Sequence, residues 1–66
     1  MTRVERENWI INIENTASYI ASEIGEEDVA STLYKYGASS VEQIAASDLA
    51  VVFSELYAIE ADLRSG

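Results

Sequence analysis

Two long segments of the chain repeat apolar residues at alternating intervals of three and four, which places them on one face of an α-helix. In the segment from Thr2 to Ile24, the repeated positions are Ile10, Ile13, Ala17, Ile20 and Ile24. In the segment from Asp48 to Arg64, they are Leu49, Val52, Leu56, Ile59 and Leu63. No proline interrupts either segment, and no stretch alternates polar and apolar residues at every second position. The sequence therefore predicts two long amphipathic helices and no strands.

A third helix is predicted between these two. Gly25 stands where a left-handed residue commonly ends a helix, and the acids after it suit the first turn of a new helix from Glu26 to Tyr36. Lys35 in the last turn and Gly37 just past the end are the expected stop signals. The residues of this helix expected to face the core are Val29, Leu33 and Tyr36.

Serine-rich and polar positions mark the helix starts. The turn Ala38-Ser39-Ser40 precedes a short helix that we expect from Val41 to Ala46, where Ser39 with Glu42 or Ser40 with Gln43 fits a capping box. Ser47 or Asp48 is expected to cap the last helix, and Thr2 or Asn8 the first.

These elements predict a single domain over residues 1–66, an all-α, small compact bundle of three main helices plus one short helix. The matched apolar faces of the first and last helices suggest antiparallel or slightly crossed packing, closed on one side by the shorter helices. The expected core is Ile10, Ile13, Ala17, Ile20, Ile24, Val29, Leu33, Tyr36, Val41, Ile44, Leu49, Val52, Phe53, Leu56, Ile59 and Leu63.

Charge narrows the function classes. Twelve acidic residues against four basic ones give a net charge of −8, and the chain has neither histidine nor cysteine. The commonest general base, the soft metal ligands and the strongest nucleophile are therefore missing. Paired carboxylates could act as acid and base, but a chain of 66 residues has little room for a substrate cleft. We expect no enzymatic activity and no cofactor.

The densest group of acids lies at the junction of the first two helices, at Glu23, Glu26, Glu27 and Asp28. Hard cations bind several oxygens, but this spacing lacks the alternating acids and central glycine of a calcium loop. Acids at the start of a helix also interact favourably with its dipole. We expect no metal site here.

The stretch from Asp28 to Ile44 reads as helix, glycine turn and helix, which loosely resembles a helix-turn-helix. Its second helix offers no arginine or lysine, and Lys35 is the nearest basic residue. Because phosphate contacts dominate affinity for nucleic acid, we expect no direct binding to DNA or RNA.

The remaining acids form rows. Asp48, Glu55 and Asp62 recur every seven residues on the last helix, and Glu7 and Glu14 do so on the first. Rows of carboxylates on a rigid body can imitate a phosphate backbone toward a basic cleft, although the polar face of any amphipathic helix is charged. The candidate partner-binding residues are Glu23, Glu26, Glu27, Asp28, Asp48, Glu55, Asp62, Glu7 and Glu14.

Aromatic residues are frequent for so short a chain. Trp9, Tyr19, Tyr34 and Tyr57 fall beside the apolar faces, where they serve either as half-buried boundary residues or as anchors of a protein interface. Ile11 and Val51 widen the apolar faces beyond what a small bundle covers, and this favours a homodimer.

No apolar run approaches the roughly 20 residues of a membrane span, and the N-terminal residues lack the apolar stretch of a signal peptide. We expect a cytoplasmic protein that does not enter membranes.

The stretch from Tyr36 to Arg64, most recognisably Tyr36-Gly37-Ala38-Ser39-Ser40 and Phe53-Ser54-Glu55-Leu56-Tyr57, resembles the C-terminal part of short acidic proteins from phages and other mobile elements. Such proteins often resemble anti-CRISPR or anti-restriction inhibitors. The resemblance implies an inhibitor that occupies the nucleic-acid cleft of a host defence enzyme, and it assigns no catalytic residue.

Two functions remain open on the sequence. The first is a non-enzymatic nucleic-acid mimic that binds the basic surface of a nucleic-acid-binding protein. The alternative is a small helical interaction or homodimerisation module with a regulatory role, in which the aromatic and apolar residues bind and the acids only keep the protein soluble. Salt separates them, because only the first should lose affinity steeply as salt rises.

Overall fold

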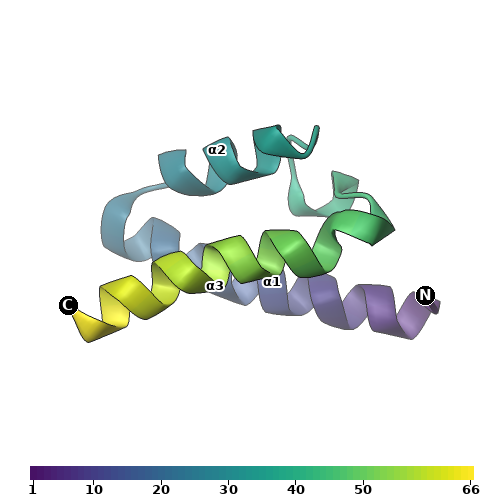
Figure 1. Ribbon diagram of the computed structural model, residues 1–66, viewed down its shortest axis with the longest axis horizontal. Helices are drawn as coiled ribbons and strands as arrows, with labels where there is room; N and C mark the ends of the chain where they lie inside the picture. Colours follow the sequence, from purple (N-terminus) through teal and green to yellow (C-terminus); the bar gives the residue numbers. More distant parts are fainter.

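The computed structural model describes all 66 residues and contains three α-helices and no strands, which confirms the predicted all-α class. The elements follow one another as α1 (Arg3–Ile24), α2 (Glu27–Lys35), η1 (Val41–Gln43), η2 (Ala46–Asp48) and α3 (Leu49–Ser65), where η marks a turn of 3₁₀-helix. The α-helices begin and end within one residue of the predicted bounds. α1 and α3 form the most extensive contact in the molecule, and α2 runs along one side of this pair (Figure 1).

α1 begins at a complete capping box. The Thr2 hydroxyl accepts a hydrogen bond from the Glu5 amide at 3.1 Å, and the Glu5 carboxylate accepts one from the Thr2 amide at 3.4 Å. Two amides that a helix start leaves without partners are thus satisfied. Of the two caps predicted, Thr2 is confirmed, and Asn8 lies inside the helix.

α2 ends in a Schellman motif built on Gly37, whose φ of 74° lies in the left-handed region that glycine adopts without a steric penalty. The Gly37 amide donates to the Tyr34 carbonyl at 3.0 Å and the Ala38 amide to the Leu33 carbonyl at 3.1 Å. Ala38 and Leu33 are both buried in the core. Ala38, which was predicted only as part of a turn, is therefore also a core residue.

α1 and α3 run parallel, so the predicted antiparallel packing is wrong. Arg6 near the start of α1 donates to the carbonyls of Glu42 and Ile44, which precede α3. Arg64 near the end of α3 lies over the ring of Tyr19, late in α1, at 4.1 Å. α2 carries the chain back along the bundle, so α3 starts at the end where α1 starts (Figure 1).

The short helix expected from Val41 to Ala46 does not form. Two 3₁₀ turns replace it, and Ile44 between them is extended, with ψ of 130°. This extended residue places the Ile44 side chain in the core. The Arg6 guanidinium satisfies the carbonyls of Glu42 and Ile44 at 2.9 and 3.1 Å, so the segment does not need helical hydrogen bonds for these groups.

The predicted capping boxes at Ser39 and Ser40 do not form, and the predicted cap at Asp48 is right in position only. The side chain of Gln43 accepts hydrogen bonds from both the amide and the hydroxyl of Ser39, at 2.9 and 2.6 Å. Ser39 therefore pairs with Gln43, whereas the prediction was Ser39 with Glu42 or Ser40 with Gln43. Asp48 occupies the N-cap position of α3, but its side chain makes no capping hydrogen bond.

The core lies where the three helices and the η segments meet. Its buried apolar residues are Ile13, Ile20, Leu33, Ala38, Ile44, Leu49, Val52 and Leu56. Every other predicted core residue packs against this cluster except Ile24, which is 48% exposed because the chain turns away at Gly25, immediately after it. Thr16 and Thr32 are buried polar residues that the apolar pattern missed. The Thr32 hydroxyl donates to the Asp28 carbonyl at 3.0 Å, so its burial leaves no unpaired donor.

Candidate interaction surfaces

The four basic side chains are all engaged within the protein. Arg3 pairs with Glu7 at 3.2 Å, Arg64 with Glu60 at 3.0 Å, and Lys35 with Glu55. Arg6 binds backbone carbonyls instead of a carboxylate. Three of the twelve acids therefore have an ion-pair partner and nine have none.

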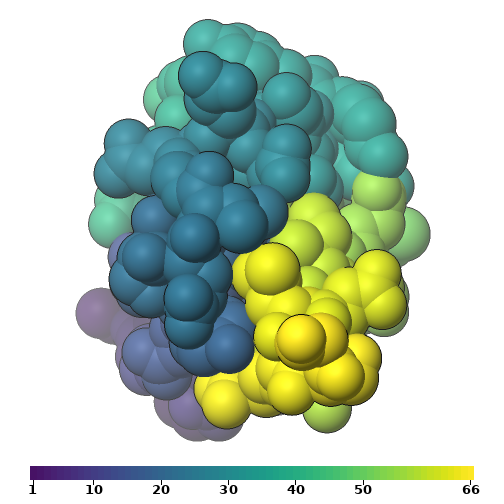
Figure 2. Space-filling model, turned by 90° about the vertical axis from the view of Figure 1, so that its left-hand side faces the viewer, coloured from purple at the N-terminus to yellow at the C-terminus, as the bar shows by residue number.

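Unpaired acids concentrate at one end of the molecule. Glu23 lies in the last turn of α1, Glu26 is the N-cap of α2, and Glu27 and Asp28 lie in the first turn of α2; all four are exposed. Because α1 and α3 run parallel, the end of α3, with exposed Asp62, lies at this same end (Figure 2). We call these five residues the acidic end. The C-terminal turns of α1 and α3 add the negative ends of their dipoles, while the first turn of α2 adds a positive one.

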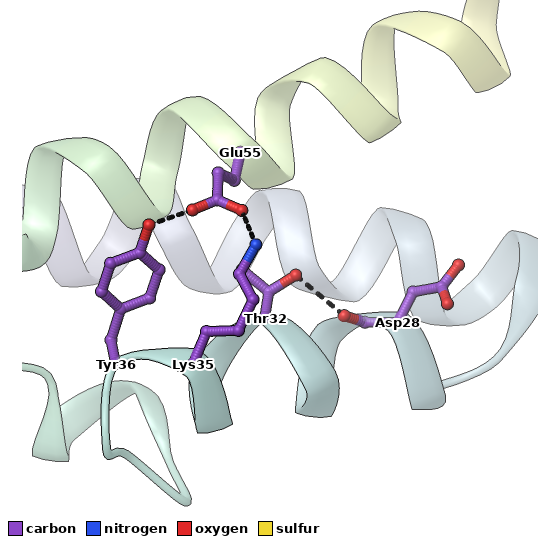
Figure 3. Close-up of polar contacts among 5 residues, drawn as sticks. All are labelled: Asp28, Thr32, Lys35, Tyr36 and Glu55. Carbon is purple, nitrogen blue, oxygen red and sulfur yellow. Dashed lines mark hydrogen bonds and ion pairs between the residues drawn. The ribbon is translucent and has the colours of Figure 1, made fainter.

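Glu55 differs from the other candidate acids because its carboxylate points toward α2 and is already bound there (Figure 3). One carboxylate oxygen accepts from the Lys35 ammonium and the other from the Tyr36 hydroxyl. The hydrogen bonds from Lys35 and Tyr36 hold the pKa of Glu55 below its ordinary value. The same contacts with Glu55 raise the pKa of Lys35 and of Tyr36. These three residues attach α2 to α3.

The predicted rows of acids are therefore interrupted. On α3, Asp48 is half-buried and Glu55 is bound to α2, so only Asp62 of that row is both exposed and unpaired. On α1, Glu7 is held by Arg3 one turn earlier, while Glu14 is exposed and unpaired. The structure gathers the junction acids with Asp62 and separates the remaining candidates.

A second surface is aromatic and lies along the contact between α1 and α3. Trp9 meets Phe53 edge to face with ring centroids 5.8 Å apart, and Phe53 meets Tyr57 at 5.7 Å. Farther along, the Arg64 guanidinium covers Tyr19, and its pairing with Glu60 raises the pKa of Arg64. The spacing of four residues between Glu60 and Arg64 is a sequence signal for their ion pair. No such local signal indicates the contact between Trp9 and Phe53, which lie far apart in the chain.

Hollows on the surface are open. One, of about 480 Å³, is lined by Arg6, Glu7, Ile10, Ile11 and Glu42. Another, of about 270 Å³, lies between α1 and α2 and is lined largely by small or apolar residues, among them Ala17, Ala21, Val29 and Ala30. Glu26 is its one charged residue. No three acidic side chains approach one another closely enough to hold a metal ion. The polar side chains that do converge, Lys35 and Tyr36 on the Glu55 carboxylate, attach α2 to α3.

No protein-family model, curated protein or solved structure matches this chain. None of the three helices combines the length and the apolar character that crossing a bilayer requires.

Proposed function

We propose that this chain is a non-enzymatic acidic binding protein that occupies the basic, nucleic-acid-binding surface of another protein. The partner class that fits best is a host defence nuclease in the cytoplasm, inhibited in the manner of an anti-CRISPR or anti-restriction nucleic-acid mimic. The proposal draws its partner class from the resemblance of Tyr36–Arg64 to acidic proteins of mobile elements.

One observation supports binding through the acidic residues. All four cations are engaged inside the protein, and nine acids have no ion-pair partner. On an ordinary solvated helical face, lysines and arginines interleave with the acids. Here the unpaired carboxylates can form charge-assisted hydrogen bonds only with a partner's cations, and such bonds are among the stronger ones at interfaces.

The acidic end is the contact that we propose first. Its five carboxylates, at Glu23, Glu26, Glu27, Asp28 and Asp62, are exposed and lack ion pairs. Ile24, which follows Glu23 directly, is 48% exposed and offers an apolar anchor beside these acids. Glu55 is excluded from this contact because Lys35 and Tyr36 already bind it, and Glu7 is excluded by Arg3.

The test is capture of partners from lysate of a host cell on the immobilised protein, followed by titration of the captured nuclease. The double variant Glu26→Lys/Glu27→Lys should weaken binding at least about tenfold at low salt, since two close pairs are reversed. Its fold should stay intact, because exposed charges contribute little to stability. For the wild type, affinity should fall steeply between low and high salt.

The matched control is Glu14→Lys/Glu42→Lys, which changes the net charge equally at exposed positions away from the acidic end. The control should weaken binding much less than the double variant at Glu26 and Glu27. Equal losses in the two variants would show that net charge alone acts and would contradict a docked acidic end. Affinity that does not change with salt would contradict the mimic itself.

A further inference from the structure

The aromatic surface lies on the side of the molecule that α2 leaves uncovered. α2 meets α1 at Ala17 and α3 at Glu55. Each residue turns a helix by about 100°, so Tyr19 lies about 200° around α1 from Ala17, and Phe53 and Tyr57 lie about 200° around α3 from Glu55. Figure 2 shows α1 and α3 side by side beneath α2. We call this side the aromatic face, and its residues are Trp9, Asn12, Tyr19, Phe53, Tyr57 and Arg64.

The aromatic face carries little of the negative charge of the chain. Its charged residues lie toward its two ends: Arg64, paired with Glu60 at the edge, and Glu23, one turn beyond Tyr19, at one end, and Glu5 at the other. Together these four residues contribute −2 of the net charge of −8. A basic partner is therefore drawn to the other surfaces. Two copies of this chain, which repel each other elsewhere, can approach here with the least repulsion.

The charges at the two ends of the face also select an orientation. Glu5 starts the face near the beginning of α1, and Arg64 ends it near the end of α3. A second copy in antiparallel orientation places each Arg64 near the Glu5 of the other copy, and it places the two acidic ends at opposite extremes of the pair. A parallel orientation brings the two Arg64 side chains together and the two acidic ends together, which like-charge repulsion opposes.

We propose that the aromatic face binds a second copy of this chain in antiparallel orientation, with Trp9, Phe53 and Tyr57 at the centre of the contact. This inference does not rest on the proposed function, because its three central residues lie away from the junction acids, and Glu23 alone borders both surfaces. Aromatic residues and arginine are the types that dominate binding energy at protein interfaces.

The available area fits a reversible dimer. The longest and shortest extents of the backbone are 36 and 16 Å, and the aromatic face spans these two directions (Figures 1 and 2). Its projected area is therefore about 580 Å² per copy, at the lower end of what specific interfaces bury. We expect a dimer that dissociates on dilution.

The experiment is sedimentation velocity on the full chain from about 10 µM to about 1 mM, a range that brackets the affinity of small interfaces. The expected mass rises from 7.3 kDa toward twice that value. Tyr57→Glu should raise the dimer dissociation constant at least about tenfold, since each dimer contains the residue twice. The control Tyr34→Glu makes the same charge change on α2, at a residue 70% exposed, and should leave the constant within about twofold.

Orientation is tested by exchanging charges. Arg64→Glu and Glu5→Arg should each weaken the dimer, and the double variant should regain most of the lost affinity because it restores the pair between copies. Circular dichroism of each variant checks that the helices are kept.

Three outcomes would overturn the proposal. A wild-type mass of 7.3 kDa at every concentration would exclude the dimer and leave the face to a different protein. Equal effects of Tyr57→Glu and Tyr34→Glu would place the contact elsewhere on the chain. A double variant no better than its single variants would refute the antiparallel orientation.

Discussion

Replacing Leu56 by alanine tests whether the contact between α1 and α3 holds the bundle together. Leu56 lies at the middle of α3, is fully buried, and belongs to the core cluster with Ile13 and Val52. Truncation removes three side-chain carbon atoms, Cγ and the two Cδ methyl groups, and leaves a cavity that two packed helices cannot fully close. Changes of this kind cost about 2 to 5 kcal/mol.

The size of the chain makes that loss large. At about 0.05 to 0.15 kcal/mol per residue, a domain of 66 residues has roughly 3 to 10 kcal/mol of stability. Each kcal/mol lost lowers the melting temperature by about 4 to 8 °C in a domain of this size. Leu56→Ala should therefore lower the melting temperature by at least about 8 °C, and it leaves the chain partly unfolded at 37 °C if the wild type lies at the lower end of the stability range.

The assay is thermal and urea unfolding followed by circular dichroism, at one fixed protein concentration because dimerisation would shift the midpoint. Tyr34→Ala is the control, since it removes a larger side chain from an exposed position on α2. A Leu56→Ala midpoint as high as that of Tyr34→Ala would refute the packing described for α3.

Three further predictions concern single contacts. Lys35 and Tyr36 lower the pKa of Glu55 below its ordinary 4.5, so its stabilising effect is complete above that value and is lost as pH falls through the lowered one. The melting temperature of wild type should therefore exceed that of Glu55→Gln near neutral pH, and a gap that persists at about pH 2 to 3 would contradict this. Gly25→Ala should cost more than Gly37→Ala, about 1 to 3 against about 1 kcal/mol by urea unfolding, because φ 91° with ψ 176° is nearly exclusive to glycine. Arg6→Lys should cost about 1 kcal/mol in the same assay, since an ammonium cannot match the fork that spans two carbonyls, and an unchanged midpoint would refute that role.

The sequence predicts the helices well because the signals for them are local. Thr2 with Glu5 caps α1, Gly25 and Gly37 end α1 and α2, and spacing alone identifies the buried faces. Each of these signals acts within a few residues along the chain, so no knowledge of the tertiary arrangement is needed to interpret it.

What the sequence did not predict depends on residues far apart in the chain. The extended conformation of Ile44 goes with a guanidinium 38 residues earlier, at Arg6. The direction of α3 follows from the path of α2, which no pattern within α3 records. Likewise, the heptad spacing places Glu55 on one face with Asp62, but only the position of α2 shows that Lys35 binds it from 20 residues away.

The unequal anchoring of the three helices gives the molecule a gradient of local stability. α2 contributes one buried apolar side chain, Leu33, while α1 contributes two and α3 three. Glycines with positive φ flank α2 on both sides, and its tie to α3 runs through the exposed Lys35 and half-buried Glu55. Partial opening that detaches α2 disrupts less apolar contact than separating α1 from α3. We therefore expect amide hydrogens of α2 to exchange with solvent through this partial opening before those around Ile13 and Leu56, and the acids Glu27 and Asp28 belong to this least anchored helix.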